Sequence, residues 1–399
     1  MSAPGRHAPL HVAIVAPPWF TVPPRGYGGV ENVCADLVTG LMDRGHTVTL
    51  VGAGASGTPG RFVSTYDEPP SARLGEPLPE VLHAAAAARA LADLSPDVVH
   101  DHTLAGPLQA RGRAVPTVVT MHGPVAGEPG EYYRQLGSTI DLVAISAAQR
   151  RSAPDLPWVG TVHNAVDVET FPFRTDKDDV LLFLGRLHPD KGVHLAIDAA
   201  RAAGLPIVVA GKCTEPVELA YLRTHVEPRL GPDVTLLGPV DATEKRALLS
   251  RAAALVFPIV WDEPFGMVMI EAMACGTPVV ALRRGSVPEV VIDGVTGILC
   301  DNPDQLPDAI HAARRLDPSD CREHVRDVFD VATMAQRYEQ VYRASIAARS
   351  PLAVAPQALH GPRPVVGRPR PPTGRTVAAS GNHDIPYEMP LRPAPSRTS

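Results

Sequence analysis

The sequence lacks any apolar run approaching the ~20 residues that a membrane-spanning helix requires. Its N-terminal apolar run, residues 10–16, is too short for the core of a signal peptide and meets Pro17 and Pro18 instead of a small-residue cleavage site. Cysteine is also scarce: the five residues are odd in number and scattered, without a Cys-x-x-Cys pair. We therefore expect reduced thiols in a cytoplasmic protein with no transmembrane segment.

A strong charge of one sign is missing as well. The net charge of −6 gives no electrostatic case for a nucleic-acid partner. A chain of 399 residues with 45% hydrophobic and 20% charged residues is typical of a soluble globular protein with two or three domains and an ample core.

The last residues, 350–399, differ in composition from the rest of the chain. They hold 11 of the 43 prolines, six arginines, no lysine and two acids, which gives this tail about +4 and the rest about −10. Such a segment cannot bury enough apolar surface to order itself. We predict a disordered tail that is dispensable for the fold, with a weak partner-binding arm as the alternative.

A doubly wound α/β unit is predicted at the start of the chain. A buried strand at 10–16 leads through a glycine-rich loop, residues 26–29, into an amphipathic helix at 30–44 and a second strand at 47–51. The loop does not fit the dinucleotide fingerprint G-x-G-x-x-G and is too long for it. It either brings backbone amides close to a phosphate or a sugar, or it only connects the two elements.

Histidines stand at the ends of the strands that follow. These strands are predicted at 97–101, 117–121, 141–145 and 158–162. Because ligand-binding groups gather beyond the carboxyl ends of parallel strands, we expect a functional role for at least one of His100, His102 and His122. The three could also suggest a metal, but no carboxylate or further ligand stands at a recognisable spacing, and we predict no metal site.

A second βα array begins after a short link near residues 165–178. Its first strand, 179–184, runs into a loop with Arg186 and Lys191, two cations that suit a diphosphate unless they are merely solvated loop charges. Further strands are predicted at 207–210, 233–237, 254–257, 278–281 and 296–300. The fold class we expect is α/β, with two facing Rossmann-like domains. Their predicted bounds are 1–168 and 169–330, followed by a helix at 331–349 that packs back onto the first domain.

Two glutamates flank the start of a predicted helix in this second array. Glu263 stands just before Pro264, which suits the first helical position, and Glu271 lies about two turns further on. The first-turn amides, which have no partner inside a helix, belong to Phe265, Gly266 and Met267. Such a helix opening suits an oxygen-rich or anionic ligand.

In this order the motifs resemble those of the retaining glycosyltransferases of family 4, which have the GT-B fold. The motifs are Gly28-Gly29, His122, Asn164 with Asp167, Gly185-Arg186 with Lys191-Gly192, and Glu263-Pro264-Phe265-Gly266 through Glu271. The resemblance covers about residues 10–348, and its most specific element is the E-x7-E segment with residues 272–279 after it. Two departures stand out: Gly285 is single where many members have two glycines, and Cys213 stands where members often have a second glycine.

The resemblance implies roles for the matching residues. Arg186 and Lys191 would hold the nucleotide diphosphate, with Gly28 and Gly29 beside it, and Glu271 would accept hydrogen bonds from the ribose. The residues implied at the transferred sugar are Glu263, His122 and the amides of Phe265, Gly266 and Met267. On the acceptor side we predict Tyr27, His100, Asp101 and His102.

The function implied is transfer of a hexose-type sugar from a UDP- or GDP-sugar to an unidentified acceptor hydroxyl. The acceptor would be a glycan, a lipid-linked molecule or a small molecule, with peripheral membrane contact possible. The nucleotide sugar is a co-substrate, so no cofactor is expected, and the two cations Arg186 and Lys191 are expected to take the place of a metal ion. A nucleotide-sugar 2-epimerase or a non-catalytic nucleotide-sugar-binding protein remains an alternative. The first would need an acid/base pair that the first domain does not show, and the second would not need Glu263 or His122.

Overall fold

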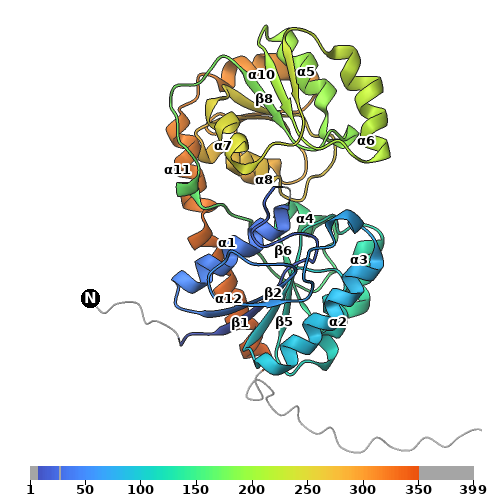
Figure 1. Cartoon of the computed structure of the whole chain (residues 1–399). Helices are drawn as coiled ribbons and strands as arrows, with labels where there is room; N and C mark the ends of the chain where they lie inside the picture. Colours follow the sequence, from blue (N-terminus) through green and yellow to red (C-terminus); the bar gives the residue numbers. More distant parts are fainter. Residues whose placement is uncertain (1–7, 27, 350–399) are drawn as a thin grey trace, which may run out of the picture. The chain divides into compact units, whose positions relative to one another are not determined.

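The computed structural model describes residues 8–26 and 28–349. Within them the chain forms two parallel α/β lobes, named here the first lobe (built on strands β1–β7) and the second lobe (built on β8–β13) (Figure 1). Tyr27 and the tail at 350–399 lie outside the described residues. No helix within the described ranges is long and apolar enough to cross a membrane.

The first lobe is built on a parallel sheet in the order β3-β2-β1-β4-β5-β6-β7. Its strands are β1 (His11–Val15), β2 (Thr47–Gly52), β3 (Arg61–Ser64), β4 (Val98–Asp101), β5 (Thr117–Met121), β6 (Asp141–Ala144) and β7 (Trp158–Thr161). Its α-helices are α1 (Gly29–Asp43), α2 (Pro77–Leu94), α3 (Glu128–Leu136) and α4 (Ala147–Ser152). Short helical turns complete it at η1 (Ser71–Arg73), η2 (Gly106–Gly112), η3 (Gly137–Thr139) and η4 (Val168–Thr170).

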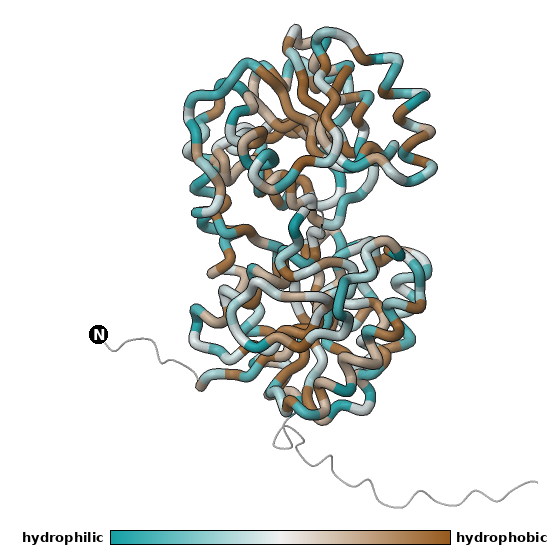
Figure 2. Tube along the Cα trace, viewed as in Figure 1, coloured by the Kyte–Doolittle hydropathy of each residue, from teal (hydrophilic) through white to brown (hydrophobic). Residues whose placement is uncertain are grey.

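Strand β1 shows why the strands of this sheet appear as unbroken apolar runs in the sequence. Val12 and Ile14 pack into the core cluster that α1 supplies, whereas Ala13 and Val15 pack into the cluster on the opposite face, beneath α2. Both faces of a parallel sheet are covered by helices, so successive side chains are all buried. The strongly hydrophobic segments in Figure 2 accordingly follow the strands inside each lobe.

The second lobe repeats the design with the strand order β10-β9-β8-β11-β12-β13, again parallel. Its strands are β8 (Leu181–Leu184), β9 (Ile207–Ala210), β10 (Val234–Leu237), β11 (Ala254–Phe257), β12 (Val279–Leu282) and β13 (Gly297–Cys300). Its α-helices are α5 (Val193–Ala202), α6 (Pro216–Tyr221), α7 (Ala242–Arg251), α8 (Met267–Ala274), α9 (Val287–Val290), α10 (Leu306–Ala313) and α11 (Pro318–Val328). Its short turns are η5 (Pro189–Lys191), η6 (Leu222–Val226), η7 (Glu227–Arg229) and η8 (Pro303–Gln305).

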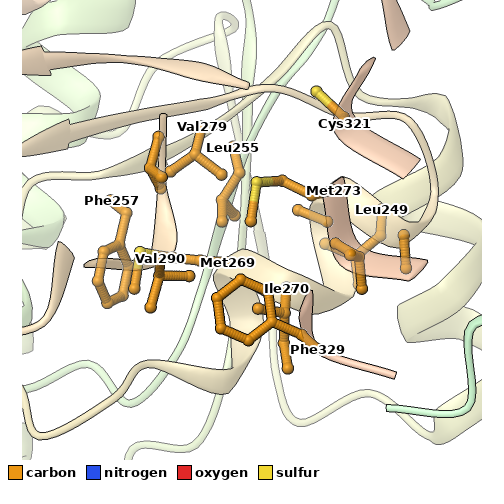
Figure 3. Packing of buried hydrophobic residues seen from close by; sticks show 14 of the residues in the cluster. Leu249, Leu255, Phe257, Met269, Ile270, Met273, Val279, Val290, Cys321 and Phe329 are labelled. Atoms are coloured by element: carbon orange, nitrogen blue, oxygen red, sulfur yellow. The ribbon is translucent and has the colours of Figure 1, made fainter. Parts of the chain in front are cut away.

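Helix α8 is embedded in the second-lobe core. Met269, Ile270 and Met273 pack against Phe329 and residues of β11 and β12 (Figure 3). Methionine fills irregular gaps well because it is unbranched and flexible. The start of α8 is therefore held firmly against the sheet.

The last helix, α12 (Val331–Arg349), returns to the first lobe, as we expected. Tyr338 and Tyr342 are fully buried in the first-lobe core. Helix α12 lies beside α1 (Figure 1), and the two approach closely at Gly40, where a Cβ would come within 2.8 Å of Val331. A larger residue than glycine would push these helices apart.

The predicted strands agree with the observed ones to within about two residues, but β3 was not predicted. Helix α8 begins at Met267 rather than near Pro264, so the prediction of Pro264 at the first helical position is wrong. Gly266 adopts a left-handed conformation (φ 80°) that separates the proline from the helix. The predicted domain boundary at 168/169 falls between β7 and β8 and stays a prediction.

Candidate functional site

A cavity of about 370 Å³ lies where loops after strands of both sheets come together. Because the strands are parallel, their carboxyl ends share one edge in each lobe, and that is where ligands bind in such sheets. The first lobe lines the cavity with Gly29, Val30, Val33, His122, Ile145 and Asn164. The second lobe lines it with Phe183, Leu184, Gly185, Arg186, Lys191, Phe257 and residues 263–268.

Most of the predicted donor-side residues meet in this cavity. Those that line it are Gly29, His122, Arg186, Lys191, Glu263, Phe265, Gly266 and Met267. Gly28 is the N-cap of α1 next to Gly29, with φ 150°, and a Cβ there would lie 2.8 Å from Pro24. Residues more than 230 positions apart in the sequence thus surround one space.

Lys191 and Glu263 form an ion pair at the wall of the cavity. Lys191 Nζ lies 2.5 Å from Glu263 Oε2, and both side chains are only 15–16% exposed. The ammonium also lies 5.2 Å from the ring centre of Trp261. Gly192 allows this placement, because its φ is 69° and a Cβ there would lie 2.2 Å from the carbonyl oxygen of Pro258.

Arg186, on the loop after β8, is held by two carboxylates. Its Nη1 lies 2.8 Å from Glu215 Oε1 and 3.3 Å from Glu218 Oε1. Glu218 is fully buried, and its carboxylate accepts hydrogen bonds from the amides of Thr214 and Glu215. Burial acts to raise the pKa of Glu218, but these backbone hydrogen bonds and the charge of Arg186 lower it below its usual value. The buried acid therefore stays ionised and orients the guanidinium.

The loop before α8 is braced by the segment that departs from the family pattern. Ser286 donates from its amide to the Glu263 carbonyl (3.1 Å) and from Oγ to the Phe265 carbonyl (2.8 Å). Gly285 has φ 50°, and a Cβ there would lie 2.5 Å from the backbone of Glu263. The single glycine at this position supports the loop that carries Glu263.

Glu271 does not line the cavity. It is 9% exposed, and its Oε1 accepts a hydrogen bond of 2.6 Å from Lys245 Nζ on α7. The negative charges of Asp167 and Glu271, after burial as the larger cause, raise the pKa of Asp36 on α1 to about 7. Glu271, the residue predicted to bind the ribose, therefore already has a cationic partner in Lys245, which the sequence did not reveal.

The predicted acceptor-side residues are placed behind the cavity rather than in its lining. His100 and Asp101 are fully buried, and His102 is 6% exposed. Asp101 Oδ1 accepts hydrogen bonds from the amide and hydroxyl of Thr103, and Arg113 lies 3.9 Å from Oδ2. The placement of His100, Asp101 and His102 at a strand end was correctly expected. Their side chains are buried, however, and cannot touch an acceptor in this arrangement. Tyr27 lies outside the described residues.

His122 is the histidine that reaches the cavity. Its Nε2 lies 2.9 Å from His102 Nδ1. Desolvation lowers the pKa of His122 to about 4, so its ring is neutral at neutral pH. A neutral imidazole donates one hydrogen bond and accepts another.

Asn164 is a cavity residue to which sequence analysis assigned no role. It is 4% exposed, and its Oδ1 has no hydrogen-bond partner among the described residues. A buried amide oxygen without a hydrogen-bond donor is uncommon and marks a place where a ligand can supply one. The available signal was its position three residues after the end of β7, at the carboxyl edge of the sheet. As for metals, the described part of the chain holds no cluster of three His, Cys, Asp or Glu side chains that could bind one.

The comparisons with known proteins agree with this geometry. Residues 27–170 match the family described as Glycosyltransferase Family 4, and residues 168–321 match Glycosyl transferases group 1. The chain is 32% identical to a glycogen synthase of Mycobacterium tuberculosis over 292 residues, which cover 63% of this chain and 69% of that protein. It is 31% identical to the alpha-maltose-1-phosphate synthase of the same species over 340 residues, covering 69% of this chain and 81% of that protein.

Solved structures share the architecture. The structure of AviGT4, a glycosyltransferase involved in avilamycin A biosynthesis, superposes with a TM-score of 0.67 at 27% identity, covering 85% of this chain and 98% of that one. HepE of Anabaena in complex with UDP-glucose superposes with a TM-score of 0.65 at 19% identity, covering 84% and 100% of the two chains. The two facing α/β lobes, the two matching family segments and these relatives lead to one conclusion. The chain belongs to glycosyltransferase family 4 and has the GT-B fold.

Proposed function

We propose that this glycosyltransferase moves a hexose-type sugar from a UDP- or GDP-sugar to an acceptor hydroxyl, with retention of configuration and without a metal. The observation that supports the proposal is the convergence of Arg186, Lys191 and Glu263 on one cavity that His122 also lines. Relatives include a glycogen synthase and an alpha-maltose-1-phosphate synthase, and HepE was solved with UDP-glucose. These names make a nucleotide-activated glucose a reasonable first donor to test.

The cations act on the leaving group. As the bond from the sugar to the diphosphate breaks, the sugar gains oxocarbenium character and the diphosphate gains negative charge. Arg186 and Lys191 would stabilise that charge most strongly in the transition state, and such differential stabilisation lowers the barrier. The carboxylates that hold Arg186 orient it before the donor arrives, so little reorganisation is needed.

The remaining cavity groups would position the sugar. Glu263 stands in the loop before α8, where its carboxylate, the loop amides of Phe265 and Gly266 and the first-turn amide of Met267 would bind sugar hydroxyls. His122 and Asn164 would approach the sugar from the first lobe. Glu271 would bind the ribose hydroxyls with the oxygen that Lys245 leaves free, and Gly28 and Gly29 would lie beside the diphosphate.

The decisive experiment is incubation of the protein with a panel of labelled UDP-, GDP-, ADP- and dTDP-sugars, with and without EDTA. We expect transfer to an added acceptor, or slow hydrolysis to the free sugar with its original anomeric configuration, and no loss of either with EDTA. Conversion to the C2 epimer would instead identify an epimerase. Tight binding with no product from any donor would identify a binding protein. Thermal stabilisation by the preferred nucleotide would narrow the choice of donor beforehand, because a ligand that binds only the folded state raises its stability.

A further inference from the structure

A buried histidine stands directly behind the histidine of the cavity. His102 Nδ1 lies 2.9 Å from His122 Nε2, and the two rings meet edge to edge, with planes inclined by 23° and centres 5.2 Å apart. His102 is 6% exposed and does not line the cavity. His102 is therefore linked to the cavity by its contact with His122.

His102 is in turn held in place by a polar network that reaches α12. Its ring centre lies 4.0 Å from that of His100. Both nitrogens of His100 are used, since Nδ1 lies 2.7 Å from the Tyr342 hydroxyl and Nε2 lies 2.7 Å from Thr120 Oγ1. Thr120 Oγ1 is also 2.8 Å from the Tyr338 hydroxyl. The returning helix thus fixes the position of a ring that touches His122.

The hydrogen-bond count decides where the proton between the two rings lies. Burial keeps His102 and His122 neutral, so each ring carries one proton. His102 Nε2 is buried with no partner among the described residues. Orphaned buried N–H groups are rarer than under-satisfied acceptors, so the His102 proton belongs on Nδ1, where it has an acceptor. His122 Nε2 is then that acceptor, and the proton of His122 must sit on Nδ1.

We propose that His102 is a positioning residue that holds His122 as its Nδ1–H tautomer and makes its remaining ring nitrogen a hydrogen-bond donor. A histidine tautomer is set by the bond that its other nitrogen makes. His122 would therefore offer an N–H to an oxygen of the bound substrate, and it would not act as a general base through Nδ1. The hydrogen bond from this N–H to a substrate rests on the proposed function, whereas the tautomer of His122 does not.

The tautomer can be measured without any substrate. In protein labelled with ¹⁵N at histidine, long-range ¹H–¹⁵N spectra distinguish Nδ1–H from Nε2–H, and the signals of His122 are assigned by their loss in His122→Gln. We expect the Nδ1–H pattern for His122 across pH 6 to 8. An Nε2–H pattern would overturn the proposal, even if the protein proves to be an active glycosyltransferase.

A matched pair of variants tests the role in turnover. In His102→Asn the side-chain amide places an N–H near the position of Nδ1, whereas His102→Leu has a similar shape and no donor. We expect His102→Leu to lower kcat by about 10- to 100-fold with the donor KM changed by less than about twofold. The asparagine variant should recover most of the loss. Equal losses in both variants would show that His102 acts only by filling space.

The two proposals fail in distinguishable ways. If the wild-type protein neither transfers nor hydrolyses the sugar of any donor, the proposed function is wrong, but the His122 tautomer still stands or falls on its spectrum. If the His102→Leu variant does not fold, as judged by circular dichroism, the wild-type spectrum decides the matter by itself. Tyr342→Phe is a useful further variant, because it removes one hydroxyl from the support of His100 and should leave the tautomer unchanged.

Discussion

Lys191 and Glu263 neutralise each other across 2.5 Å at the wall of the cavity before any substrate is present. A diphosphate that binds beside Lys191 must therefore share this ammonium with a carboxylate. If Lys191 is lost, Glu263 faces the diphosphate without compensation. The pair makes the two residues energetically dependent on each other, and that dependence can be measured.

The first prediction concerns this coupling. Lys191→Met should weaken binding of UDP, or of whichever nucleotide is preferred, by about 10- to 100-fold, and adding Glu263→Gln should recover part of that loss because it removes the uncompensated charge. Glu263→Gln alone should leave nucleotide binding within a few-fold but lower turnover by on the order of 10²-fold. Calorimetric titration and steady-state kinetics check these outcomes, and strictly additive effects on binding would contradict the coupling.

Arg186 provides a second prediction. A lysine cannot reach Glu215 and Glu218 while also presenting a planar fork to a diphosphate. Arg186→Lys should therefore lower kcat/KM by about 10²-fold, nearly as much as Arg186→Ala. Arg201→Lys is the matched control, since Arg201 also pairs with an acid, Asp233, but does not line the cavity. Full activity in Arg186→Lys would show that the planar guanidinium is not required at this position.

Glu271 and Lys245 provide a third prediction, which separates binding from chemistry. Glu271→Gln keeps the shape of the side chain but weakens its acceptor strength toward the ribose hydroxyls and toward Lys245. We expect the donor KM to rise by roughly tenfold, with kcat nearly unchanged, because a ribose contact is the same in the ground and transition states. A 2′-deoxyribonucleotide donor should show little further loss in this variant. An unchanged donor KM would count against the ribose contact.

The fourth prediction concerns stability and pH. Burial and the nearby charges of Asp167 and Glu271 raise the pKa of Asp36 from 3.8 to about 7. As the pH rises above about 4, Asp36 ionises in the unfolded chain but stays protonated in the folded one until about pH 7. The contribution of Asp36 to stability is therefore lost between pH 4 and pH 7. Asp36→Asn should thus be more stable than the wild type at pH 8, on the order of 1 kcal/mol, and equally stable near pH 4.

Thermal denaturation at the two pH values measures this difference. Asp43→Asn is the control on the same helix, because Asp43 is exposed. A gain at pH 8 of the same size in both variants would show that the effect comes from net charge rather than from the environment of Asp36.

The fifth prediction tests the contact between α1 and α12. A Cβ at Gly40 would lie 2.8 Å from Val331 Cγ1 and 2.9 Å from Ala335 Cβ, so Gly40→Ala should cost about 1–3 kcal/mol of stability by overpacking. Gly112→Ala is the control, because a Cβ there meets nothing within 4 Å. Urea denaturation of the two variants should separate them clearly. Equal stability would mean that the helices can move apart at little cost.

Much of the fold was predictable because the strands of a parallel sheet are buried on both faces. The runs at 117–121, 207–210 and 254–257 consist of apolar and β-branched residues bounded by turn signals, and each is a strand over those residues. Strand β3 was missed because its burial is only partial at an edge of the sheet. The start of α8 was misplaced because Pro264 suits a first helical turn equally well by local chemistry. In the structure Gly266 is left-handed instead, and a Cβ there would lie 3.4 Å from Phe257 of β11, a contact that depends on tertiary packing.

The sequence by itself determined the family, the two βα arrays and several of the groups that line the cavity, among them Arg186, Lys191 and Glu263, since these follow from local patterning and from the order of short motifs. Only the tertiary structure decided which of those groups are paired. Local spacing could not connect Glu271 with Lys245, Arg186 with Glu218, or His122 with His102, because each pair joins different elements whose distance is set by packing. The tertiary structure also showed that the side chains of His100 and Asp101, predicted on the acceptor side, are buried. Burial beneath neighbouring elements depends on how the whole chain packs.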